Sequence, residues 1–117
     1  MEPYKREMTM GDYSTVAEII ETMFEINDEL AGADKYIHEA TKLKASSPEA
    51  ASMKVSNSAD ELKHADNLTV TVGKMMDKLK AENNPCYGVM SMFWHHLKDG
   101  HAEWMAKIRM KHEQYKK

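Results

Sequence analysis

The sequence predicts an all-α fold, arranged as an antiparallel helical hairpin with a third long helix that completes a bundle by oligomerisation. The 117 residues include only 5 glycines and 3 prolines, too few for a chain with many turns. Good helix formers such as alanine, methionine, leucine, lysine and glutamate are abundant. Apolar residues recur at alternating spacings of three and four over long segments, which is typical of helices that pack side by side.

The first helix is predicted over about residues 13–43, and residues 1–12 are expected to form a flexible N-terminal arm. A stripe of mostly apolar residues runs from Ile19 to Leu43 along one face of this helix. Glu29 falls in the middle of the stripe. A carboxylate in a packing face is costly unless it is paired, protonated or bound to a metal.

A short break at residues 45–49 separates this helix from the second, which is predicted over about residues 48–82. Pro48 in the first turn, with Glu49 three residues after Ser46, is typical of a helix start. Because the break is short, the two helices are expected to pair antiparallel.

The second break contains Asn84 and Pro85, followed by Gly88, a combination that ends one helix and allows another element to begin. The third helix is predicted over about residues 87–114, and residues 13–117 form a single domain. This helix carries both tryptophans and four of the six histidines. It is expected to cover the hairpin or to contact another subunit.

Glu61 and His64 form a Glu-x-x-His motif in the second helix. A spacing of three places both side chains on one helix face, one turn apart. A carboxylate oxygen and an imidazole nitrogen suit iron and several other divalent metals. This pair is one half of the ligand set of di-iron carboxylate sites in helical bundles, which also need a lone Glu from a neighbouring helix.

The hairpin predicts that Glu29 supplies that third ligand. With the turn centred at Ser46–Ser47, Glu29 lies level with His64, and Glu61 lies level with Gly32, about one turn away. The three side chains are therefore expected to converge as a metal site. The alternative interpretation is a hydrogen-bonded polar network that fixes the register of the helices.

These residues resemble the ferritin-like family, and the nearest pattern is the encapsulated-ferritin and rubrerythrin-like half-bundle type. In that type a lone Glu precedes a Tyr by seven residues on the first helix, and a Glu-x-x-His follows on the second. Here Glu29 and Tyr36 occupy the first helix and Glu61 and His64 the second, and the resemblance covers roughly residues 20–80.

The resemblance implies that Glu29 binds one iron, that Glu61 bridges two irons, and that His64 binds through a ring nitrogen. Tyr36 would form hydrogen bonds just behind these ligands. The implied activity is oxidation of Fe(II) to Fe(III) by oxygen or peroxide. The chain carries one ligand set, whereas a full bundle carries two, so the di-iron site is expected to be shared between the subunits of a homodimer or larger homo-oligomer.

Two further interpretations follow from the sequence. His101 and Glu103 of the third helix lie near the height of His64 and could be accessory ligands, whereas His95 and His96 are expected to be exposed. The alternative function is a non-enzymatic helical interaction or assembly module that has the fold without the metal.

Composition argues against several other classes. The net charge of −3, with both signs interspersed, gives no basic surface for nucleic acid. No apolar run predicts a membrane span or a signal peptide, and Cys86 is the only cysteine, so we expect a cytoplasmic protein. Residues 111–117 contain no apolar tail of the kind that targets cargo to encapsulin shells, and encapsulation is therefore not expected.

Overall fold

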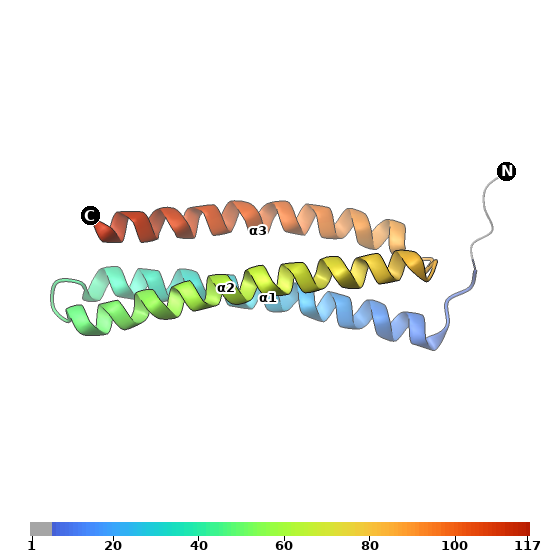
Figure 1. Ribbon diagram of the computed structural model, residues 1–117, viewed down its shortest axis with the longest axis horizontal. Helices are drawn as coiled ribbons and strands as arrows, with labels where there is room; N and C mark the ends of the chain where they lie inside the picture. The colour runs from blue at the N-terminus through green and yellow to red at the C-terminus, as the bar shows by residue number, and fades with distance from the viewer. Residues whose placement is uncertain (1–5) are drawn as a thin grey trace.

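Three long helices account for most of the computed structural model, which describes residues 6–117 (Figure 1). They are α1 (Met10–Leu43), α2 (Pro48–Ala81) and α3 (Tyr87–Lys116). The all-α prediction is confirmed. Helices α1 and α2 form an antiparallel hairpin, and α3 returns along one side of it in the direction of α1. Within the described residues, no helix has both the length and the apolarity that crossing a membrane requires.

The core lies mainly between α1 and α2, which pack along their whole length. Its buried apolar side chains are Ile19, Met23, Ile26, Leu30, Ala33, Ile37 and Ala40 of α1, and Leu62, Ala65, Val72, Met76 and Leu79 of α2. Helix α3 adds Met90, Trp94, Met105 and Ile108. Its contacts with the hairpin are sparser, so α3 is the most loosely attached of the three helices.

The start of α1 corrects the predicted arm over residues 1–12, of which residues 1–5 lie outside the described part. The helix begins at Met10 because Thr9 and Asp12 form a capping box: the Thr9 hydroxyl accepts a hydrogen bond from the Asp12 N–H, and the Asp12 carboxylate accepts one from the Thr9 N–H. Arg6 holds the same carboxylate through two further hydrogen bonds. The Thr-x-x-Asp spacing was the signal in the sequence that the prediction missed.

Both breaks occur where the sequence places them. Helix α2 starts at Pro48 with Ser47 as its N-cap, but Ser47 makes no side-chain capping bond, so the helix-start pattern of Ser46 and Glu49 gives the position without forming a capping box. The end of α2 is capped by the backbone. Asn83 adopts a left-handed conformation with φ 55°, which asparagine tolerates better than most residues.

The register of the hairpin follows from its short turn. Lys54 of α2 pairs with Glu39 of α1 at 2.7 Å, and these two residues are equidistant from the turn centre in the sequence. The Ser58 hydroxyl, which is fully buried, donates a hydrogen bond of 2.7 Å to the carbonyl of Ala33. A slip of either helix would leave these polar groups without partners, so the packing fixes the relative height of all side chains on α1 and α2.

We predict that Ile26→Ala lowers the free energy of unfolding by about 2–5 kcal/mol, because Ile26 is fully buried between the helices and its truncation leaves a cavity. Urea denaturation followed by circular dichroism measures the change. The control is Glu25→Ala, one residue away on the exposed side of α1, for which we expect a change within about 0.5 kcal/mol. Equal effects of the two substitutions would contradict the position of the core.

Candidate metal centre

Three side chains predicted as ligands converge between α1 and α2. Glu29 comes from the middle of α1, and Glu61 and His64 lie one turn apart on α2. The His64 Nδ1 atom is 3.4 Å from Glu29 Oε2 and 4.0 Å from Glu61 Oε1. One ligand atom from each residue lies within 4.8 Å of the other two. The structure therefore places these three ligands together.

Gly32 lets the Glu61 side chain lie across α1. A Cβ atom built at Gly32 would have the Glu61 carboxylate as its nearest neighbour, 3.4 Å away. The expected levels, Glu29 with His64 and Glu61 with Gly32, are thus both confirmed. A Cβ atom at position 32 would make an ordinary van der Waals contact with the Glu61 carboxylate.

The three ligands lie at the edge of the hairpin rather than in its core. The side chains of Glu29 and Glu61 are 28% and 27% exposed, and that of His64 is 56% exposed. The fully buried position beside Glu29 belongs to Leu30. The stripe predicted on α1 therefore contained half-buried residues. Glu29 was predicted to lie in the packing face, but the residue that packs there is its neighbour Leu30.

This edge faces away from α3. Helix α3 contacts the side of α1 that carries Asn27 and Asp34, whereas Glu29 projects roughly 140–160° from both residues around the helix axis. We call the edge that contains the ligands the open face, defined by Thr22, Glu29 and Tyr36 of α1 and Lys54, Glu61 and Leu68 of α2, all of which are half-buried. No described residue of this chain covers the ligands from that side.

The electrostatics of the site favour a bound cation. The neighbouring Glu29 carboxyl group, together with partial burial, raises the pKa of Glu61 above its ordinary value of 4.5. Glu29 Oε2 is itself buried and has no hydrogen-bond partner among the described residues. Two neighbouring carboxyl groups, one of them with an unsatisfied oxygen, would both be stabilised by a positive ion.

The spacing of the donor atoms also suits a metal. Two atoms bonded to the same ion at about 2.1 Å lie about 3–4 Å apart, which is the range of the His64 separations from Glu29 and Glu61. Carboxylate and imidazole ligands accept iron, zinc, manganese and other divalent ions. The group can therefore hold a metal ion, and its chemistry leaves the choice of metal open.

Tyr36 lies on the open face two helical turns beyond Glu29, about 10 Å along the axis. The Lys54 ammonium group sits 5.3 Å from the centre of its ring. Among the hydrogen bonds of residues 6–117, none joins Tyr36 to one of the ligands. Its hydrogen-bonding role behind the ligands stays a prediction.

The accessory ligands considered on α3 do not reach the site. His101 is 5% exposed and its Nε2 atom lies 2.5 Å from Asn27 Oδ1, on the opposite side of α1 from Glu29. Glu103 points into solvent beside Lys107. Height along the hairpin was predicted correctly, but the sequence did not show which side of the hairpin α3 occupies. His95 and His96 are exposed, as expected.

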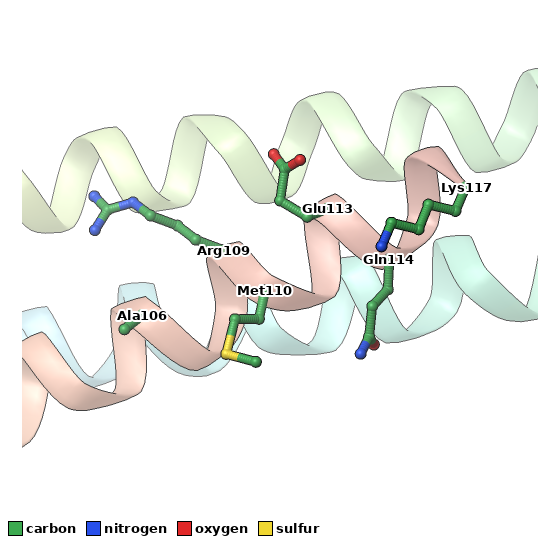
Figure 2. A pocket seen from close by; sticks show the side chains of 6 residues that line it. All are labelled: Ala106, Arg109, Met110, Glu113, Gln114 and Lys117. Atoms are coloured by element: carbon green, nitrogen blue, oxygen red, sulfur yellow. The ribbon is translucent and has the colours of Figure 1, made fainter.

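A separate pocket on α3 offers no comparable chemistry. Figure 2 shows its six lining residues, Ala106, Arg109, Met110, Glu113, Gln114 and Lys117, all of which belong to α3. A hollow between the side chains of one exposed helix surface lacks the converging elements that bind small molecules. The metal ligands therefore remain the better candidate site.

Comparisons with protein families, with curated proteins and with solved structures find no match to this chain. No comparison supports the ferritin-like family expected from the sequence, and that expectation depends only on Glu29, Glu61, His64 and the geometry that brings them together.

We predict that Glu61→Gln stabilises the metal-free protein at pH 7 by less than about 1 kcal/mol. Because the pKa of Glu61 is raised in the folded state, its protonated form stabilises the fold below pH 4.5 and this contribution is lost as the pH rises. Glutamine resembles the protonated form of glutamate at every pH. The stability difference between Glu61→Gln and the wild type should therefore disappear in acid.

The measurement is the unfolding free energy of both proteins between pH 4 and pH 7 in the presence of a chelator. Asp77→Asn, on the exposed surface of α2, is the control and should show no such gain at pH 7. If Glu61→Gln is less stable than the wild type at pH 7, the folded protein does not destabilise the ionised form of Glu61, and the prediction is wrong.

Proposed function

We propose that this chain is an iron-binding, ferritin-like protein that oxidises Fe(II) to Fe(III) at a di-iron site assembled between two copies. Each copy would contribute Glu29, Glu61 and His64. The observation that carries the proposal is the convergence of these three side chains, from two helices, at one height on the edge of the hairpin.

The position of the ligands supports assembly between subunits. They lie on the open face, opposite α3, where a second hairpin can approach without displacing any described part of the chain. A two-fold axis through this face would bring the same three ligands together twice. The result would be four carboxylates and two imidazoles from four helices, which is the ligand set of di-iron bundles.

Each residue would have a distinct role. The Glu61 carboxylate lies against α1 at Gly32, and in a paired site it would be suited to bridge two ions. Glu29, with its unsatisfied buried oxygen, would bind one ion. His64 is the most exposed of the three and would bind from the outer side. Iron held there would give one electron per ion to oxygen or peroxide.

We predict that the wild-type protein binds about one Fe(II) per chain in an anaerobic titration and forms ferric iron on exposure to air. Glu61→Ala should weaken binding at least tenfold, because the bridging carboxylate is lost. The control is Asp60→Ala, which removes an exposed carboxylate from the neighbouring position. Binding that is absent in the wild type would contradict the proposal and favour a metal-free interaction module. Binding that is unchanged in Glu61→Ala would contradict the assignment of the site to Glu61.

We also predict that metal drives dimer formation. Without a cation, a second copy on the open face would bring four carboxyl groups together, and their repulsion and desolvation oppose association. Sedimentation velocity should show a shift toward monomer in a chelator and toward dimer with anaerobic Fe(II), and Glu61→Ala should lose this response. A protein that binds iron and stays monomeric would contradict the shared site while leaving iron binding intact.

A further inference from the structure

Two histidines on one face of α3 contact the hairpin. His101 and His112 are eleven residues apart, so they lie three turns apart along α3 and project in nearly the same direction. His101 contacts Asn27 of α1, and His112 contacts Ser58 of α2. The two imidazoles therefore tie α3 to both helices of the hairpin.

His101 is held in its neutral form by its surroundings. Its Nε2 atom lies 2.5 Å from the carboxamide oxygen of Asn27, which can only accept, so Nε2 carries the proton. Its Nδ1 atom is buried and has no hydrogen-bond partner among the described residues. Protonation would add an N–H group and a positive charge at this buried nitrogen, where no acceptor is available.

His112 is constrained in the same way. Its Nε2 atom lies 2.8 Å from Ser58 Oγ, and the Ser58 hydroxyl already donates its only hydrogen to the carbonyl of Ala33. Ser58 can therefore only accept from His112, so Nε2 of His112 is the donor. The neutral imidazole satisfies this arrangement, and a second proton on the ring would put a charge in the interface.

The carboxylates of this interface are already paired. The charged groups on the facing surfaces are Asp34, His38 and Lys44 of α1, Asp66 of α2, and Arg109, Lys111, Glu113 and Lys116 of α3. Asp34 binds Lys111 at 2.6 Å, Asp66 lies 3.5 Å from Arg109, and Glu113 binds Lys116 at 3.0 Å. Each of these carboxylates already pairs with a cation, so only Glu113 adds a partial attraction for a positive charge on His112.

We propose that His101 and His112 form a pH-sensitive latch that keeps α3 docked on the hairpin at neutral pH and releases it in mild acid. The proposal is independent of the metal site, which lies on the opposite side of the hairpin. Release would expose the side of the hairpin that α3 covers, together with the buried Trp94 and Ile108 of α3 itself.

The direction of the effect follows from the folded environment. Burial lowers the pKa of His101 below its ordinary value of 6.5. Burial, followed by the charge of Lys116, lowers the pKa of His112, and Glu113 opposes this only partly. Docking is therefore fully favoured above pH 6.5 and weakens as the pH falls below it, by up to about tenfold per pH unit for each histidine.

Asp34 does not share this response. Its burial raises its pKa, but hydrogen bonds from Lys111 and Trp104 outweigh that effect and lower the pKa below its ordinary value of 3.8. Asp34 consequently stays ionised at pH 5, so acid does not directly weaken its bonds to Lys111 and Trp104 of α3. Asp34 therefore does not contribute to the acid response between pH 7 and pH 5.

The tryptophans provide the measurement, because both lie on α3 and Trp94 is only 5% exposed. In the full chain with a chelator, we expect their emission to shift to longer wavelength and acrylamide quenching to increase between pH 7 and pH 5. The double substitution His101→Gln and His112→Gln should abolish this change, since the glutamine amide can donate where Nε2 donates and does not titrate. An unchanged emission in the wild type would overturn the latch.

The matched control is the double substitution His95→Gln and His96→Gln, which removes two exposed histidines from the same helix. This variant should keep the wild-type pH response. If the latch variant does not fold, the wild-type protein decides the question by NMR titration of His101 and His112. Values at or above 6.5 would overturn the proposal, and values below 6.5 that coincide with the change in emission would support it.

Discussion

The short turn between α1 and α2 is the constraint on which the rest of the structure depends. It fixes the height of every residue on one helix against the other, and the buried hydrogen bond from Ser58 to the Ala33 carbonyl locks that register. Glu29 and His64 are 35 residues apart in the sequence, and they meet because they are equidistant from the turn. One residue added to the turn would rotate and shift α2 against α1, and the site would be lost before any ligand was changed.

The edge position of the ligands reflects a compromise between two costs. Full burial of two carboxylates and an imidazole in a single apolar hairpin would need a cation at all times, because unpaired buried charges cost several kcal/mol. Full exposure would leave the side chains free to rotate, and metal affinity would fall with the entropy of ordering them. At roughly a quarter exposed, Glu29 and Glu61 are held by packing and remain accessible to an ion from solvent. Leu30, fully buried beside Glu29, anchors that turn of α1.

The sequence predicted those features that depend on distance along the chain. Proline and asparagine positions set the helix ends, and the turn centre set the levels of Glu29 and Glu61, because both follow from helical rise alone. The direction in which a side chain points around the bundle could not be obtained this way. It depends on where α3 packs, and amphipathic spacing alone does not distinguish the two sides of a hairpin. For that reason His101 was predicted at the correct height along the hairpin but lies on the side of α1 opposite Glu29. For the same reason Glu29 was predicted to lie in the core, whereas it lies at the border of the core.

The two faces of the hairpin differ in their response to positive charge. On the open face, acidic groups have an excess of negative charge, which a cation would relieve. On the face covered by α3, every carboxylate already has a partner, and the imidazoles of His101 and His112 must stay neutral. Positive charge would therefore favour association of a second copy on the open face, and it would oppose the docking of α3 on the other face. Because Asn27 and Glu29 are two residues apart on α1 but project to opposite sides, one helix can meet both demands without a conflict between them.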